Sequence, residues 1–506
     1  MRRLRLYVLL TGLSLPFIGK PVHIDDTNFL ALARGARIDP WRPHLVQINW
    51  QGTTERAFDV LSNPPGIGWW LAPVADAAVS IQHLWMLPWL WLATWGALRL
   101  GAMLTGRAEP AAWLILGSPV ALLATQSLTP DLPLLACVLA GMSGVLRPIP
   151  ETGGCRRWPW ALLVGAAALF RYSGAVLIPV VALWPWLHGD KRGALKLGAA
   201  AAAPLALLAL HDLSAYGEVH LLAMAGFQGV ANTGSQLLHK GAASVAMLGG
   251  AVVLPVLCWV RPRRALVGMM VGAALGCTAV SLLGITGGGA IAGVLAAAAG
   301  GASLGGAVQT DTPTAKLLLC WLALGLFFLL SLRFAATRYW LPFMAPAVLL
   351  CLQAAPGRLV QPAVGLTVLL GIALSVDDLE LAHAQEFAAS EAQAQGTGLI
   401  AGHWGFQHHL ERAGWVALED DAPVPAGTLL AISPNAWPQT PSGCLEPTGT
   451  VSFPDRWPGP RVHTRTGGAN LHGHSLAGTP PLPTLSPWSF GTDPLDRLVL
   501  YRGCLD

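Results

Sequence analysis

His23-Ile24-Asp25-Asp26-Thr27-Asn28-Phe29 places two adjacent carboxylates directly after the first apolar segment of the chain. The stretch opens a polar loop that runs from Lys20 to about Trp70, in a chain otherwise built of apolar runs. Acidic side chains at the end of a membrane segment are costly unless they serve a function. We therefore predict that this first outer loop, taken as residues 20–76, contains the catalytic site.

The composition is that of a membrane protein. Of the 506 residues, 53% are hydrophobic and only 11% are charged, whereas soluble domains carry about 25% charged residues. We predict an all-α polytopic membrane protein with about eleven to thirteen transmembrane helices, because the apolar runs have the length of a membrane span. The net charge of +4 is small, and we expect membrane lipids rather than nucleic acid as partners.

The distribution of Lys and Arg between the loops predicts the orientation. The candidate membrane segments are 5–19, 77–100, 110–128, 132–147, 158–187, 193–211, 241–260, 265–284, 287–309, 315–332, 339–355 and 359–376. With the N-terminus inside, sixteen basic residues, Arg156 and Arg261 among them, fall in inside regions, against Lys240, Arg333 and Arg338 in the outside loops after the first. Positive residues prefer the cytoplasmic side, so Asp25 and Asp26 are expected outside. The first segment is interpreted as an uncleaved helix, since no small-x-small cleavage site follows it.

Residues 158–187 break simple alternation, because the run is long for one crossing and short for two. Arg171-Tyr172-Ser173-Gly174 lies at its middle, and both flanks are basic. We predict two short helices that enter from the cytoplasm and return, with Arg171 at the bend inside a protein-lined cavity. The alternative is an ordinary long helix from which the arginine reaches the interface.

The amino-acid composition changes after Ser375. Residues 377–506 are rich in Pro and Gly, and we predict a small α/β extracytoplasmic domain there, following a transmembrane domain at 1–376. Its expected elements are helices at 378–394 and 406–413 and strands at 398–402, 415–418, 429–433 and 498–502. Counting the bent segment as two crossings puts this domain on the side of Asp25. In that oxidising compartment Cys444 and Cys504 are candidates for a disulfide, worth roughly 3–4 kcal/mol.

The carboxylates and arginines at the outer membrane end could carry chemistry together. Residues 26–36 have the spacing of an amphipathic surface helix, which either Asp25 or Asp26 could cap. One cap needs one carboxylate, and the other could act as a general base or hold a metal. Asp131 follows at a second outer end, where it could also be a turn residue. Arg171 and Arg338 could bind phosphate oxygens, although Arg338 could equally be an interfacial anchor.

The histidines suggest less. His408 and His409 could belong to a metal cluster, but such sites need a third ligand and a defined geometry. We prefer a structural strand-to-helix turn and assign no metal ligand. A divalent metal ion is left open as a cofactor.

Several motifs, in order, resemble a known family. They are the acidic pair Asp25-Asp26 with its surface helix, Asn63-Pro64-Pro65-Gly66, Thr129-Pro130-Asp131-Leu132-Pro133, Phe170-Arg171-Tyr172-Ser173-Gly174 and Thr337-Arg338-Tyr339-Trp340-Leu341-Pro342. In this order and sidedness the chain resembles the GT-C glycosyltransferases. The nearer relatives are the dolichyl-phosphate-mannose protein mannosyltransferases and the bacterial lipid A aminoarabinose transferases, of glycosyltransferase family 39 and its neighbours. The resemblance covers roughly residues 1–376 and is thinnest over 215–310.

The resemblance implies transfer of a sugar from a polyprenyl-phosphate donor to a lipid, glycan or protein acceptor, with inversion at the anomeric carbon. Asp25 and Asp26 would be catalytic; Asp25 is favoured as the base with Asp26 as its partner, and which of the two is the base stays open. The substrate would be bound by Asp131, Arg171, Tyr172, Arg338, Tyr339 and Asn63. The implied location is the bacterial inner membrane, with the C-terminal domain in the periplasm. Two departures matter: Asp26 stands where many relatives have Glu, and Arg171 stands where aminoarabinose transferases have Lys. The first departure leaves the division of roles between Asp25 and Asp26 open. Because of the second, the resemblance does not predict which sugar is transferred.

Two other classes of function remain open. A polytopic transporter or a flippase for lipid-linked glycans would also place charges within the membrane, but transporters often show inverted repeats, and we find none between the halves. The third class is an inactive scaffold that presents the outer domain to partners.

Overall fold

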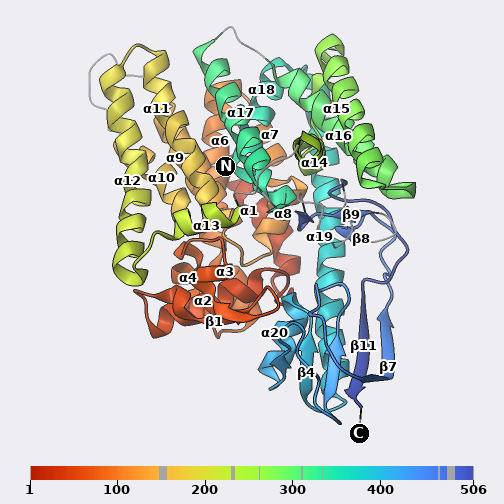
Figure 1. Ribbon diagram of the computed structural model, residues 1–506. Helices are drawn as coiled ribbons and strands as arrows, with labels where there is room; N and C mark the ends of the chain where they lie inside the picture. The colour runs from red at the N-terminus through yellow and green to blue at the C-terminus, as the bar shows by residue number, and fades with distance from the viewer. Residues whose placement is uncertain are drawn as a thin grey trace.

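The computed structural model describes residues 2–147, 157–228, 234–260, 262–308, 312–332, 334–464, 468–475 and 485–504. Of the basic residues used above to predict the orientation, Arg156, Arg261 and Arg333 lie outside the described residues. Figure 1 shows a bundle of helices at one end of the molecule and a smaller region with the strands β4, β7 and β11 at the other.

The bundle contains several helices that could cross a membrane. Among the described residues, five are long and apolar enough: α12 (Lys191–Tyr216), α15 (Pro262–Leu283), α16 (Gly287–Ala307), α17 (Pro313–Ser331) and α19 (Gly357–Gln393). A sixth span results if α7 (Ala108–Leu116) and α8 (Pro119–Thr125), bent by 72°, are taken as one. Shorter apolar helices lie at Leu4–Phe17, Asp131–Val145, Trp158–Leu169 and Tyr172–Leu187. The predicted class, a helical multi-pass membrane protein, is confirmed, while the number of crossings stays a prediction.

The bundle also contains the helices α1 (Arg2–Ser14), α6 (Leu87–Thr105), α9 (Asp131–Val145), α13 (His220–Gln228), α14 (Gly234–Ala251) and α18 (Leu341–Ala354).

Close contacts between small residues hold part of the bundle together. Helices α15 and α16 pack so closely that a Cβ on Gly301 would lie 2.2 Å from the carbonyl oxygen of Gly268. The glycines of α16 thus let the two helix backbones approach, as small residues do in membranes.

Residues 158–187 form two helical arms that meet at Arg171. The first arm is α10 (Trp158–Ala166) with η4 (Ala167–Leu169), and the second is η5 (Tyr172–Leu177) with α11 (Ile178–Leu187). Arg171 between them has an extended backbone, with φ −149° and ψ 138°. Both arms pack against α12. The predicted pair of short helices with Arg171 at the break is confirmed.

The first outer loop is folded into short elements. They are α2 (Asp26–Ile38), η2 (Pro43–Leu45), β1 (Gln47–Asn49), β2 (Thr54–Arg56), α3 (Ala57–Val60), α4 (Gly66–Leu71), η3 (Ala72–Val74) and α5 (Val79–Trp85). Strands β1 and β2 pair in antiparallel fashion. Helix α2 buries Phe29, Leu30 and Ala33, so the helix predicted at 26–36 is confirmed.

The C-terminal region is built on one sheet. Its strand order is β5-β4-β6-β11-β7, formed by β4 (Gly398–Ala401), β5 (Val416–Ala417), β6 (Leu429–Ile432), β7 (Leu445–Phe453) and β11 (Asp496–Gly503). β4 is parallel to β5 and β6, and β11 is antiparallel to β6 and β7. Helix α20 (Trp404–Arg412) packs against α19 and β4. The predicted elements are confirmed, whereas β7 was not predicted.

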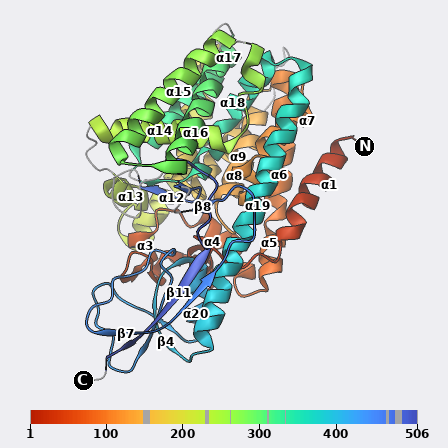
Figure 2. The ribbon, with the colours of Figure 1, turned by 90° about the vertical axis from the view of Figure 1, so that its right-hand side faces the viewer.

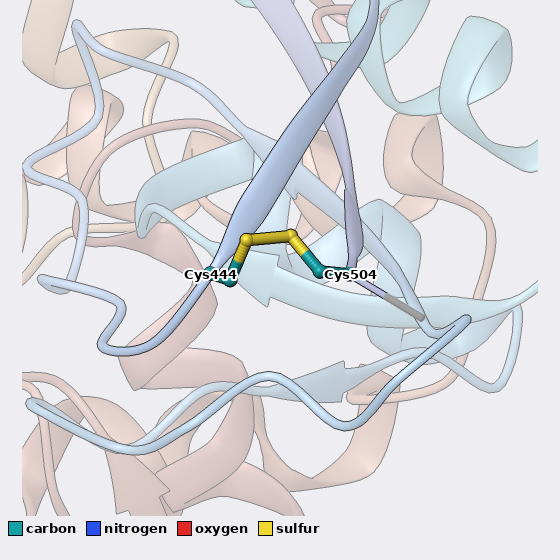
Figure 3. Close-up of a disulfide and its surroundings, with 2 residues drawn as sticks. All are labelled: Cys444 and Cys504. Carbon is teal, nitrogen blue, oxygen red and sulfur yellow. A yellow bond between two sulfur atoms is a disulfide. The ribbon is translucent and has the colours of Figure 1, made fainter. Parts of the chain in front are cut away.

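Two features of this region bear on the predicted domains. Cys444 and Cys504 form the predicted disulfide, with their Cα atoms 5.4 Å apart (Figure 3). Helix α19 continues without a break through the predicted boundary at 376/377, and Figure 2 shows it running from the bundle to the sheet. The division into two domains stays a prediction.

The C-terminal region contacts the first loop directly. Asn49 donates to the carbonyl oxygen of Leu418 at 3.1 Å, and Gln439 donates to Asn49 Oδ1 at 3.1 Å. Farther along the chain, β10 (His474–Ser475) pairs with β3 (Phe334–Ala335), next to η7 (Thr337–Trp340). The loop that carries Asp25 and the C-terminal region therefore lie on the same side of the bundle.

Candidate active site

Four charged side chains from four distant segments form one cluster at the end of the bundle. Arg338 in η7 forms an ion pair with Asp25, and its Nε lies 3.3 Å from Asp131 Oδ2. Arg171, at the break between the two helical arms, forms an ion pair with Asp131 at the start of α9. Carboxylates and guanidinium groups thus alternate in the order Asp25, Arg338, Asp131, Arg171. The structure thus brings together four residues that were predicted as site residues from separate sequence motifs.

Tyr339 completes the cluster on one side. The guanidinium carbon of Arg171 lies 4.2 Å from the centre of the Tyr339 ring, and that of Arg338 lies 6.0 Å from it. An aromatic face attracts a cation at such distances. Tyr339 therefore helps to hold two positive charges near one another, an arrangement suited to binding an anion.

The two adjacent aspartates have different environments. Asp25 precedes α2, but its side chain makes no capping hydrogen bond; its carboxylate pairs with Arg338 and is 22% exposed. Asp26 is buried, and its Oδ1 accepts a hydrogen bond from the Leu128 N–H at 2.8 Å. Burial raises the pKa of Asp26 to about 7, although Lys20 lowers it. Asp26 thus ties the first loop to the segment before Asp131, while Asp25 is open to a substrate.

Two buried atoms of the cluster are paired by charge but do not form a hydrogen bond. Arg338 Nε and Asp131 Oδ2 are buried and lie 3.3 Å apart as an ion pair, but they do not form a hydrogen bond, and neither atom has another hydrogen-bond partner among the described residues. Buried polar atoms in proteins are normally hydrogen-bonded, so a buried atom without a hydrogen bond can indicate a binding site. A ligand oxygen that approached Arg338 would compete with Asp131 for the Nε donor.

Tyr172 and Asn63, also predicted to bind substrate, make their hydrogen bonds elsewhere. The Tyr172 hydroxyl lies 2.7 Å from His220 Nδ1, and the Asn63 carbonyl oxygen lies 2.9 Å from His44 Nε2. The rings of His44 and His220 are 4.9 Å apart. Burial lowers the pKa of His44 to about 3 and that of His220 to about 4. These residues form a second, uncharged cluster that joins the first loop to the arm after Arg171.

Gly66 fixes the distance between the first loop and this bend. A Cβ on Gly66 would lie 2.3 Å from the carbonyl oxygen of Leu169 and 3.3 Å from the Phe170 ring. No side chain fits there, so glycine allows α4 to contact the chain just before Arg171. The Asn63-Pro64-Pro65-Gly66 motif therefore acts as a positioning element.

A pocket lies beside the charged cluster and reaches residues that the motifs did not single out. It is lined by His23, Ile24, Asp26, Val120, Leu123, Ala124, Ser127, Thr129, Arg338, Leu471 and His472. His23 stands in the opening acidic stretch, but no role was predicted for it. Its neighbour Asp378 is fully buried and pairs with Lys20. Sequence reasoning missed this group because His472 and Asp378 are far from His23 in the chain.

His408 and His409, the predicted turn histidines, lie in α20 with their rings 5.4 Å apart. Burial lowers the pKa of His408 to about 3, so that its ring is neutral. Among the described residues, the three-residue group that could hold a metal ion is instead His23, Asp378 and His472.

Comparisons with known proteins give two solved structures. Both are of ArnT from Cupriavidus metallidurans, one bound to undecaprenyl phosphate and one in the apo state. The first is 15% identical with a TM-score of 0.43, and the match covers 86% of this chain and 92% of that chain. The second is 15% identical with a TM-score of 0.39, covering 85% and 93%. No family model and no curated protein matches the chain.

ArnT is a lipid A aminoarabinose transferase of the GT-C group. At this identity and TM-score, function has to be argued from the geometry of this chain.

Proposed function

We propose that the chain is an integral-membrane glycosyltransferase that moves a sugar from a polyprenyl-phosphate donor to an acceptor on the extracytoplasmic face. The observation that carries this proposal is the position of Arg338 between Asp25 and Asp131. One guanidinium there holds a carboxylate suited to act as a base, Asp25, and turns its Nε to a second carboxylate, Asp131, without forming a hydrogen bond to it. A bidentate phosphate contact is the chemistry that arginine favours.

The proposed reaction uses the cluster in two roles. The acceptor oxygen attacks the anomeric carbon, and the carboxylate of Asp25 takes the acceptor proton. The bond from the anomeric carbon to the phosphate oxygen breaks, and polyprenyl phosphate leaves with the electron pair. Arg338 and Arg171 stabilise the negative charge that develops on the leaving phosphate. Direct displacement of this kind inverts the anomeric carbon.

Binding of the donor and activation of the base are coupled in this proposal. The charges of Asp25, Arg338, Asp131 and Arg171 balance one another in the structure. A phosphate that engages Arg338 competes with Asp25 for the same guanidinium. Asp25 is then released toward the acceptor at the moment when the donor is in place.

The test is an assay of the purified protein with candidate polyprenyl-phosphate sugars, in which release of polyprenyl phosphate is followed by mass spectrometry. We expect Asp25→Asn and Asp26→Asn to abolish transfer while expression and membrane insertion are unchanged. Asp76→Asn is the matched control, because Asp76 is an exposed carboxylate near the end of the same loop that pairs with Arg34 and Arg37. Full activity in both Asn variants would refute the proposal. Movement of the lipid across the membrane without release of polyprenyl phosphate would favour a flippase.

We also propose that the protein lies in a bacterial inner membrane, with the C-terminal region and the first loop in the periplasm. The disulfide between Cys444 and Cys504 supports this side, since disulfides persist in oxidising compartments. Labelling of Ser390→Cys, at an exposed position of α19, by a membrane-impermeant maleimide in spheroplasts tests the orientation. Labelling only after lysis would place the region in the cytoplasm.

A further inference from the structure

A group of three possible metal ligands lies beside the candidate active site. One nitrogen each from His23 and His472 and one carboxylate oxygen of Asp378 lie within 4.8 Å of one another. His23 comes from the turn before α2, Asp378 from α19, and His472 from the segment that follows β9 (Ala469–Asn470). Three parts of the chain therefore converge on this point.

The hydrogen bonds around His23 orient its free nitrogen toward the other two ligands. Gln385 Oε1 accepts a hydrogen bond from the Gly405 N–H at 3.1 Å, which identifies this atom as the oxygen of the amide. His23 Nδ1 lies 3.1 Å from the same oxygen and so must donate its proton to it. In the neutral ring, Nε2 then carries the lone pair.

The Nε2 atom of His23 lacks a suitable partner. It lies 3.5 Å from Asp378 Oδ1, is buried, and has no hydrogen-bond partner among the described residues. A lone pair that faces a carboxylate oxygen is repelled by it, and a buried polar atom without a partner is costly. A cation between the two atoms would convert this repulsion into attraction.

We propose that His23, Asp378 and His472 bind a divalent transition-metal cation, for which Zn²⁺ is the best match. Two imidazole nitrogens and one carboxylate oxygen are a ligand set of zinc sites that keep the fourth position open. The hydrogen bond from His23 to Gln385 is the outer contact that metal-bound histidines typically make. The open position would face the pocket that Asp26 and Arg338 also line.

The distances require local adjustment, because the three ligand atoms lie within 4.8 Å of one another. Tetrahedral zinc with bonds of about 2.0–2.1 Å holds its ligand atoms about 3.3 Å apart. His23 and Asp378 are close to this separation, at 3.5 Å. His472 Nε2 lies only 2.6 Å from Asp378 Oδ1 and must withdraw by less than 1 Å. It can do so because its side chain is partly exposed, at 11%, and the residue lies in a bend outside the helices and strands.

Lys20 is the main opposing charge. Its ammonium group pairs with Oδ2 of Asp378 and leaves Oδ1 to the two histidines. A carboxylate can serve a lysine on one oxygen and a metal on the other. Asp26, which lines the same pocket, adds a carboxyl group near this positive charge.

The metal would join the first loop to α19 and the C-terminal segment at the edge of the candidate active site. Its relevance to catalysis rests on the proposed glycosyltransferase function, but the binding itself does not. The experiment therefore measures binding without any sugar donor.

The full-length protein, purified in detergent, is treated with a chelator, desalted, and incubated with Zn²⁺ or Co²⁺ before a second desalting step. Metal content is measured by mass spectrometry, and tetrahedral Co²⁺ is followed by its visible absorption. We expect one Zn²⁺ per chain in the wild type and a loss of at least tenfold in bound metal in His23→Ala and His472→Ala. His383→Ala is the matched control, because His383 is a partly exposed histidine on the same helix as Asp378.

A further variant distinguishes a metal site from a hydrogen-bonded cluster. Gln385→Leu removes the outer contact of His23 and should weaken metal affinity about 10–100-fold while the disulfide and the elution volume on size exclusion stay unchanged. The proposal is overturned if the wild type binds no metal above the level of the histidine variants. It is also overturned if His383→Ala loses metal as His472→Ala does.

Discussion

Arg338 forms an ion pair with Asp25 although 313 residues separate them in the chain. The contact joins the start of the first outer loop to the short turn before α18. The same guanidinium approaches Asp131 from the other side. One arginine thus fixes two carboxylates from different loops at one site, and most of the candidate active site depends on it.

Replacing Arg338 by Lys should reduce transfer about 10²–10³-fold, since a charged donor aimed at the leaving group is lost. Lysine keeps the charge but cannot form the planar two-point contact. The measurement is the rate of polyprenyl phosphate release at saturating donor. Arg34→Lys, in the exposed pair with Asp76, should leave the rate unchanged. Equal rates for Arg338→Lys and the wild type would contradict the assigned role.

Replacing Asp131 by Asn should destabilise the protein, because it leaves the buried Arg171 and the largely buried Arg338 facing a neutral side chain. Breaking a buried ion pair by removing one partner costs about 3–5 kcal/mol. Thermal unfolding in detergent measures the effect. Asp59→Asn breaks an exposed pair with Arg56 and should cost at most about 1 kcal/mol. A similar shift for both variants would argue against a buried charge cluster.

Replacing Gly66 by Ala should separate the first loop from the bend at Arg171, because the new methyl group would overlap the Leu169 carbonyl oxygen. Overpacking of this kind costs about 1–3 kcal/mol, and the transfer rate should fall with it. Gly365→Ala is the control, since a Cβ at that position of α19 meets no atom within 4 Å. Unchanged melting temperature and rate in Gly66→Ala would show that the contact is not needed.

Removing the disulfide should weaken the C-terminal region. The bridge closes a separation of 60 residues, worth about 3–4 kcal/mol in the chain-entropy model. The double variant Cys444→Ser with Cys504→Ser should be cleaved faster in limited proteolysis, with cleavage confined to the region after α19. Cys277→Ser, at an exposed free cysteine, serves as control. Alkylation of Cys444 and Cys504 in the unfolded, non-reduced wild type would show that the bridge does not form.

The stability of the C-terminal region should fall as the pH rises from about 4 to about 7. Burial raises the pKa of Asp496 from 3.8 to about 7, although Arg497 and Ser433 lower it through hydrogen bonds. The folded state therefore binds this proton more tightly than the unfolded state. The resulting contribution to the free energy of unfolding is complete below pH 4 and is lost as the pH rises through the folded pKa of about 7. Proteolysis rates between pH 4 and 8 should be less pH-dependent in Asp496→Asn. The exposed Asp421→Asn should keep the wild-type profile, and an unchanged profile in Asp496→Asn would refute the assignment.

Local patterns predicted the elements that have a clear periodicity. The amphipathic spacing after Asp26 predicted α2, and the bend at Arg171 followed from the length of its apolar run. Strand β7 was missed because Leu445–Phe453 contains Pro447 and Gly449 and is largely exposed. It forms an edge of the sheet, where hydrophobic alternation is not required.

The sequence by itself determined that this is a membrane protein with an acidic first loop, because the apolar content and its spacing are properties of the chain. It also predicted Asp25, Asp131, Arg171 and Arg338 as site residues, each from a separate motif. Only the tertiary structure decided that Arg338 holds Asp25 while Asp26 is buried against Leu128. It alone placed His472 beside His23 and Asp378. The physical reason is that ion pairs and ligand sets depend on which distant segments pack together, and no local periodicity records that.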